Sequence, residues 1–175
     1  MTDKIVADEV LGEFARQEHD WFERVRKGSL NSKEVVRAVQ NIIDRGSVFA
    51  YDKRKDGWEL IEDVAFAPFD VSKMKLVPFL KSGESSANSE EMVSRALELK
   101  ANFGQRDAEY LLEHQQEIPK EFRKYYIVFT GTKWRNPDGN RNVAYLNWNG
   151  KQWYLNFNWL ENDWNSNDRL PRLRE

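Results

Sequence analysis

The chain has 175 residues, of which 40% are hydrophobic and 32% charged, and its formal net charge is −2. This balance is typical of a folded globular protein with one domain or two small ones, and it excludes a disordered chain. The sequence contains no cysteine, which excludes disulfide scaffolds, thiolate metal sites and catalysis by a thiol.

The sequence predicts neither a secretion signal nor a membrane span. The first ten residues, MTDKIVADEV, contain two acids among the first eight positions and no apolar core, unlike a signal peptide. No segment approaches the roughly 18 consecutive apolar residues that a spanning helix needs. We therefore expect a cytoplasmic protein that does not associate with membranes.

Two amphipathic helices are predicted at the N-terminus. Apolar residues recur at three- and four-residue spacing between residues 4 and 27, with charged residues between them. Asn31 and Glu34 have the spacing of a capping box that opens a second helix, and Gly46 would end it. Residues 1–46 are thus expected to form a helical hairpin. One hairpin cannot bury both apolar stripes alone, so it would dock on the rest of the chain or form a homodimer.

Residues 47–73 have the least regular pattern of the sequence. A polar turn at residues 53–57 separates two short apolar runs, and Pro68 limits any long regular element. The sequence leaves two interpretations open for this part, a linker between subdomains and a small irregular segment.

Two further helices are predicted before the C-terminal strands. Asn88 and Glu91 have the spacing of a capping box, and their helix would run from about residue 90 to residue 102. Gly104 stands where a left-handed glycine ends many helices. The next helix would cover residues 105–116. We expect both helices to pack on one face of the sheet that follows, giving an α+β domain over residues 74–175.

Residues 125–164 predict an antiparallel meander of three to four strands. This stretch contains five of the seven tryptophans and two turn signals, Pro137-Asp138-Gly139 and Asn149-Gly150. Strands are expected at about 125–134, 141–148 and 151–159. We interpret Asn149-Gly150 as a two-residue turn, which would place Leu146 opposite Trp153.

Strand alternation divides the side chains of the second and third strands between two faces. One face carries the tryptophans and predicts the packed core. The other carries Tyr145 and Tyr154 among asparagine and glutamine residues, and Arg135, Arg141 and Lys151 flank the turns. We predict a binding site composed of these five residues.

Motifs spread over the chain outside residues 47–76 carry a resemblance. They are VLGEF at 10–14, GSLNSKEVVRAVQ at 28–40, FLKSGES at 79–85, AEYLLEHQQEIPKEFRKYY at 108–126, GTKWRNPDG at 131–139, NGKQWYLNFNWL at 149–160 and RLPRLR at 169–174. Together they resemble an uncharacterised family of small modular proteins from candidate-phylum bacteria. The resemblance carries no known activity and implies a modular, cytoplasmic protein.

No catalytic or metal-binding motif accompanies these features. The two histidines, His19 and His114, form no pair with metal-ligand spacing, and the serine-rich loop at 82–86 lacks the pattern of a phosphate-binding loop. A helix-turn-helix is disfavoured because the helix at 105–116 is acidic and DNA phosphates would repel it. We therefore expect no cofactor, no metal ion and no catalytic residue.

The leading functional prediction is a non-enzymatic module that binds a protein partner with the polar-aromatic face of the meander. The alternative is binding of single-stranded nucleic acid by the same surface, because tyrosines beside cations can stack on unpaired bases. An enzyme of unidentified class ranks third, since no set of residues can be given catalytic roles.

Overall fold

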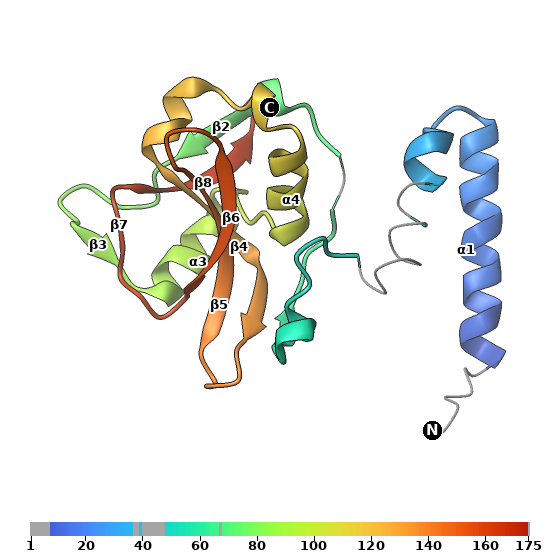
Figure 1. The fold of residues 1–175 in the computed structure, drawn as a ribbon, viewed down its shortest axis with the longest axis horizontal. Helices are drawn as coiled ribbons and strands as arrows, with labels where there is room; N and C mark the ends of the chain where they lie inside the picture. Colours follow the sequence, from blue (N-terminus) through green and yellow to red (C-terminus); the bar gives the residue numbers. More distant parts are fainter. Residues whose placement is uncertain (1–7, 37–38, 40–47, 67, 175) are drawn as a thin grey trace. The chain divides into compact units, whose positions relative to one another are not determined.

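The computed structural model describes residues 8–36, 39, 48–66 and 68–174. The chain divides into two compact units, Met1–Val48 and Phe49–Glu175 (Figure 1). We describe each unit by itself.

Helix α1, Asp8–Arg26, is the main element of the N-terminal unit. After it, Asn31 Oδ1 accepts a hydrogen bond from the N–H of Lys33 at 3.0 Å, at the start of the helical residues 32–36. None of residues 16–36 and 39 is buried. Apart from residue 39, the rest of the predicted second helix, including its stop at Gly46, lies outside the described residues, and the hairpin stays a prediction.

The C-terminal unit is built on a mostly antiparallel sheet of six strands (Figure 1). The strand order is β2-β8-β4-β5-β6, with β1 also paired to β4, and only β4 and β8 run parallel. The strands are β1 Glu59–Glu62, β2 Met74–Val77, β4 Tyr126–Arg135, β5 Arg141–Trp148, β6 Trp153–Trp159 and β8 Asp168–Leu173. Two short strands, β3 Ser86–Ala87 and β7 Trp164–Asn165, form a separate pair. The fold class is α+β, as predicted.

Helices α3, Ser89–Glu98, and α4, Gln105–Glu113, lie between β3 and β4 in the chain. The predicted capping box of α3 is present, because Asn88 Oδ1 accepts from the N–H of Glu91 at 3.0 Å. Four short 3-10 helices complete the unit: η1 Lys53–Asp56, η2 Val71–Lys73, η3 Gln115–Glu117 and η4 Lys120–Lys124. No helix in the described part of the chain is long and apolar enough to cross a membrane.

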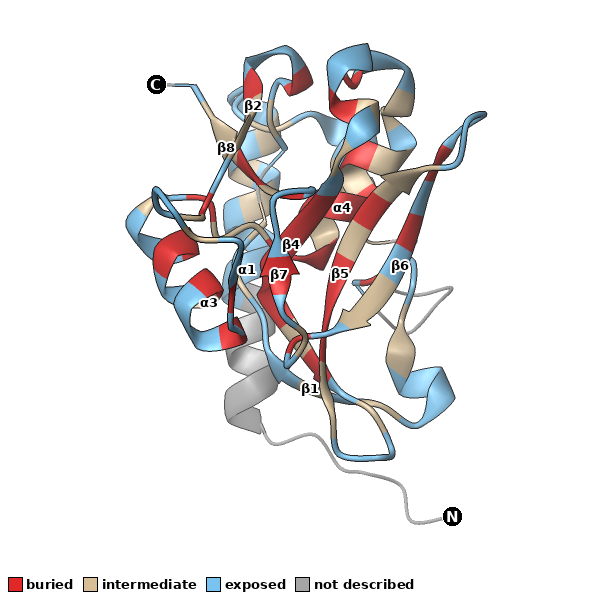
Figure 2. Ribbon diagram, turned by 90° about the vertical axis from the view of Figure 1, so that its left-hand side faces the viewer, coloured by how far each residue is buried: buried red, intermediate tan, exposed pale blue. Residues whose placement is uncertain are grey.

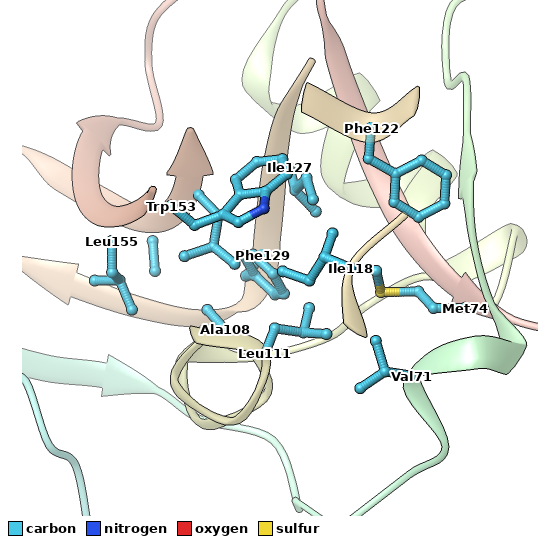
Figure 3. Close-up of a cluster of buried hydrophobic side chains, with 12 residues drawn as sticks. Val71, Met74, Ala108, Leu111, Ile118, Phe122, Ile127, Phe129, Trp153 and Leu155 are labelled. Atoms are coloured by element: carbon cyan, nitrogen blue, oxygen red, sulfur yellow. The ribbon is translucent and has the colours of Figure 1, made fainter. Parts of the chain in front are cut away.

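The two helices cover opposite faces of the sheet, so the expectation that both pack on one face is wrong. Leu111 of α4 lies in one buried cluster with Phe129 of β4 (Figure 3). Met92 of α3 lies in another with Val128, the neighbouring β4 residue, whose side chain points the other way. Figure 2 shows the buried residues concentrated along β4 and β5. Helical periodicity locates the apolar stripe of each helix but does not say which face of a sheet receives it.

The β5–β6 hairpin has a different register from the predicted one. Leu146 pairs with Leu155 instead of Trp153, so the loop has four residues, 149–152. Asn149 shapes this loop, because its Oδ1 accepts hydrogen bonds from the N–H groups two and three residues later, each at 2.9 Å. A shift of two residues leaves every side chain on its predicted face.

Residues 49–73 belong to the C-terminal unit. They contain η1, β1 and η2, and Phe49 and Val71 are buried among them. The Trp58 ring meets the Phe157 ring of β6 edge-on, with the centroids 5.6 Å apart. These residues, for which the sequence left a linker or an irregular segment open, therefore contribute to the core.

An irregularity in β4 brings it close to the start of α4. Phe129 pairs with Ala144 and Lys133 with Val143, so residues 130–132 have no partner in β5. A Cβ at Gly131 would lie 2.9 Å from the backbone oxygen of the residue at position 102. The close approach of the two backbones therefore requires glycine at this position.

The expectation that Gly104 ends α3 in the left-handed conformation is wrong. It is the N-cap of α4 with φ −102°, and Lys100 takes the left-handed conformation with φ 52°. A Cβ at Gly104 would lie 2.6 Å from Thr132 Oγ1 and 2.8 Å from Val64 Cγ2. The glycine is needed for packing and not for its freedom at positive φ.

Candidate functional site

The part of the sheet that α3 leaves uncovered carries three tyrosines and two asparagines. We call this surface the tyrosine face; it consists of Tyr126, Tyr145, Asn147, Tyr154 and Asn156. Tyr126 is 46% exposed and Tyr154 is 42% exposed, while Tyr145 and Asn147 are partly exposed and Asn156 is exposed. Strand alternation turns all five away from α4.

Contacts among its own residues hold the tyrosine face in place. The rings of Tyr126 and Tyr145 meet edge to face, with the centroids 5.8 Å apart. Asn156 Nδ2 donates a hydrogen bond to Asn147 Oδ1 at 2.8 Å. Burial raises the pKa of Tyr145, and the Tyr126 phenol adds to this effect. The Tyr145 hydroxyl therefore stays protonated at neutral pH.

Arg135 and Arg141 lie where β4 ends and β5 begins, four or more residues from Tyr145 along the strands, or about 13 Å. Arg135 Nη1 lies 2.8 Å from Glu59 Oε2. Arg141 lies between two carboxylates, with Nε 2.7 Å from Glu161 and Nη2 2.8 Å from Glu90, and both raise its pKa. The structure therefore separates these two predicted site residues from the tyrosines and pairs each with acids.

Lys151 lies in the loop at the other end of β5 and is exposed. The loop, residues 149–152, borders the tyrosine face. Asn147 lies two residues before its start and Tyr154 two residues after its end, and the two pair across the strands. No ion pair to Lys151 is present within the residues the structure describes. Of the five predicted site residues, the structure thus places Tyr145 and Tyr154 on one face and Lys151 in the loop that borders it.

Tyr126 belongs to the tyrosine face but was not among the predicted site residues. The two faces were predicted only for the second and third strands. Applying the same alternation to the first strand would place Tyr126 on the face of Val128, opposite Ile127 and Phe129. The alternation in the sequence thus contains the face of Tyr126. Its position beside Tyr145 also depends on the register of β4 against β5, in which Val128 lies opposite Tyr145.

A second group of polar residues lies at the start of α4, on the other side of the sheet. Gln105 is buried; its Nε2 donates to Tyr51 O at 2.9 Å and to Glu109 Oε1 at 2.7 Å. Its Oε1 accepts from Trp134 Nε1 at 2.6 Å. The Glu109 carboxylate accepts from the N–H groups of Ala50 and Tyr51, each at 2.9 Å, and burial raises its pKa. These bonds fix residues 50 and 51 on α4.

A pocket of about 420 Å³ opens near the start of α4. Its lining residues are Ala65, Phe69, Leu97, Lys100, Asn102, Phe103, Asp107 and Leu173. Asp107 is 5% exposed, and burial raises its pKa to about 6. Its Oδ2 accepts from the Gly104 N–H at 2.7 Å, so the carboxylate caps the first turn of α4. Among the described residues, no three His, Asp or Glu side chains are grouped as a metal ion would require.

Comparisons with known proteins found no matching family model, no similar curated protein and no similar solved structure. The resemblance to small modular proteins of candidate-phylum bacteria therefore stays a prediction.

Proposed function

We propose that this protein is a non-enzymatic module that binds a protein partner through the tyrosine face. The observation that carries the proposal is the grouping of three tyrosines, all at least partly exposed, on one face of adjacent strands. Tyrosine gives a large contact area at a small cost in conformational entropy, and it is enriched among the residues that dominate binding energy. The strands hold the rings in position before a partner arrives, which lowers the cost of binding.

The tyrosine face also indicates the chemistry of its partner. None of its five residues is charged. On the same side of the sheet, Asp168 of β8 lies opposite Tyr126, but it is buried and its carboxylate accepts from the Asn165 N–H at 2.8 Å. We infer that the partner presents apolar, amide and hydroxyl groups and few charges, because a desolvated charge would find no counter-ion on this surface.

The distribution of cations favours a protein partner over single-stranded nucleic acid. A groove that follows a nucleic-acid backbone needs free cations beside its stacking residues. Arg135 and Arg141 lie at the far end of the sheet in ion pairs, and Lys151 is the single predicted cation that borders the tyrosines. This surface therefore supplies aromatic stacking without the matching positive charge.

A comparison of retained proteins tests the proposal. The wild type and the double variant Tyr126→Ser/Tyr154→Ser are immobilised and exposed to lysate of the source organism, and bound proteins are quantified by mass spectrometry. We expect a protein that the wild type retains and the double variant does not. Titrated as a purified protein, it should bind the double variant about tenfold or more weakly, because two contact residues are lost.

Tyr51→Ser is the matched control. Tyr51 is 46% exposed, like Tyr126, but its backbone is held by Glu109 of α4, away from the tyrosine face. This variant should bind as the wild type does. Equal retention by the double variant would contradict the proposal. Binding of a single-stranded oligonucleotide at low salt, abolished in the double variant, would replace the protein partner with nucleic acid.

A further inference from the structure

Three strands of the sheet have an unpaired edge, and they differ in length and charge. Strands β1 and β2 have four residues each, and they carry Glu59, Glu62 and Lys75. Strand β6 ends the strand order with seven residues, WYLNFNW, and has no charge and no proline. Proteins usually protect an exposed edge with a short strand, a charge or a proline. Strand β6 has none of these protections.

Hydrogen bonds at both ends of the β5–β6 pair show which backbone groups of β6 face its free edge. The N–H of Asn149 donates to Gln152 O at 3.2 Å, and the N–H of Leu160 donates to Arg141 O at 2.8 Å. Hydrogen-bonded pairs alternate along an antiparallel ladder. The even-numbered residues of β6 therefore bond to β5, and the odd-numbered ones turn their N–H and C=O groups outward.

At the two ends of β6 the outward N–H groups already have partners. Trp153 N–H donates to Gln115 Oε1 at 3.1 Å, and Trp159 N–H donates to Asn158 Oδ1 at 3.0 Å. In the middle of the strand, the backbone N–H and C=O groups of Leu155 and Phe157 face the free edge. No described residue forms a hydrogen bond with these groups. The open part of the edge is therefore centred on residue 156.

We propose that β6 pairs with β6 of a second copy of this chain, antiparallel, about a two-fold axis at Asn156. In this register Leu155 of each copy lies opposite Phe157 of the other. These are the residues whose N–H and C=O groups face outward, so the two pairs exchange four backbone hydrogen bonds. The inference does not depend on the proposed function, and the surface differs from the N-terminal hairpin for which the sequence predicted a homodimer.

The side chains of this register suit a second copy of the same strand. Leucine meets phenylalanine on the α4 side, and Asn156 meets its own copy on the tyrosine face, where two amides can bond to each other. No like charges meet within the strand pair, because β6 contains no charged residue. The nearby Lys53, whose Nζ lies 5.5 Å from the Phe157 ring centre, forms an ion pair with Asp56. The pairing also joins two tyrosine faces side by side.

A single cysteine tests the register, because the natural chain contains none. In Asn156→Cys the two thiols would face each other across the axis in a non-hydrogen-bonded pair, with Cα atoms about 4.5 Å apart, which a disulfide can span. The control is Asn147→Cys on β5. Its thiols would be three strand spacings apart across the sheet and about four residues apart along the strands, roughly 20 Å in all. Under mild oxidation of the full chain, the disulfide dimer should form roughly tenfold or more faster at position 156.

A charge exchange tests the same contact without a covalent bond. Asn156→Lys or Asn156→Glu places two like charges on the axis, and each variant alone should be monomeric by sedimentation. A mixture of the two should form a heterodimer, and the wild type should dimerise as its concentration rises. The interface is short, so the equilibrium should be weak and concentration-dependent.

Equal disulfide rates at positions 156 and 147 would mean random collision and overturn the proposal. A wild type that remains monomeric at high concentration, together with no association in the Lys/Glu mixture, would also overturn it. Thermal unfolding of each variant confirms that the fold is intact. Asn156 is exposed, and its side chain donates a hydrogen bond to the partly exposed Asn147, so we expect the variants to fold.

Discussion

The polar groups at the start of α4 and those of the tyrosine face differ in where their hydrogen-bond partners come from. Gln105 and Glu109 are buried, and the chain supplies their partners from a strand, a helix and the segment at residues 50–51. Tyr126 and Tyr154 are nearly half exposed, and no described residue accepts a hydrogen bond from their hydroxyls. The first group completes the fold of one chain, whereas the second leaves contact area and hydrogen-bonding groups open to another molecule.

The largest effect should come from removing the centre of the buried group. Gln105→Ala leaves Trp134 Nε1 and Tyr51 O without their partners and opens a small cavity. Losing buried partners costs about 1–3 kcal/mol for each orphaned group, so we expect about 4 kcal/mol of lost unfolding free energy. Denaturant titration measures it from the midpoint and slope.

Gln152→Ala is the matched control, since Gln152 is an exposed glutamine in the loop beside the tyrosine face. No described residue forms a hydrogen bond with its side chain, so the unfolding free energy should change by less than about 0.5 kcal/mol. Similar costs for the two variants would show that the buried group does not hold the fold, and the distinction between the two regions would fail.

The next effect concerns pH and the buried carboxylate of Asp107. Burial raises its pKa in the folded state from 3.8 to about 6. A raised carboxyl pKa means that the folded state prefers the proton. The contribution of protonated Asp107 to the stability of the folded state is fully present below about pH 4, and it is lost as the pH rises through about 6. Between these limits the wild type should lose about 3 kcal/mol relative to Asp107→Asn, which cannot titrate.

The difference between the two proteins is the quantity to measure, at a series of pH values from 3.5 to 7.5 (about the range of the transition). Other carboxylates also have shifted pKa values: burial raises the pKa of Asp168, and the hydrogen bond from Arg95 lowers that of Glu84. These contributions cancel in the comparison, because both proteins contain them. A difference that does not vary with pH would place Asp107 in contact with solvent.

The C-terminal fold could be predicted in large part because its signals are local. Alternation and turn residues located the strands at 125–134 and 141–148, and the capping box located α3. Three features required tertiary information. The face that each helix covers, the pairing of β1 and β2, and the irregularity in β4 all depend on contacts between residues distant in the chain, which periodicity does not encode.

The candidate site was predicted in part, for a related reason. Tyr145 and Tyr154 were assigned to one face because strand alternation is local, and the two-residue register error preserved that assignment. Arg135 and Arg141 were assigned by closeness in sequence to a turn. Their acidic partners, at positions 59, 90 and 161, are far away in the chain, so no local pattern could show that they are ion-paired.

The smallest effect on stability should come from the tyrosine face itself. Tyr154→Ser removes a ring that is 42% exposed, so the unfolding free energy should change by about 0.5 kcal/mol or less. Tyr145→Ser should cost more, about 1–2 kcal/mol, because that ring is half-buried and packs edge-on against Tyr126. Chemical denaturation of both variants gives the order. If Tyr154→Ser destabilised the protein as much as Gln105→Ala, Tyr154 would be part of the fold, and its exposure would no longer indicate a surface kept for a partner.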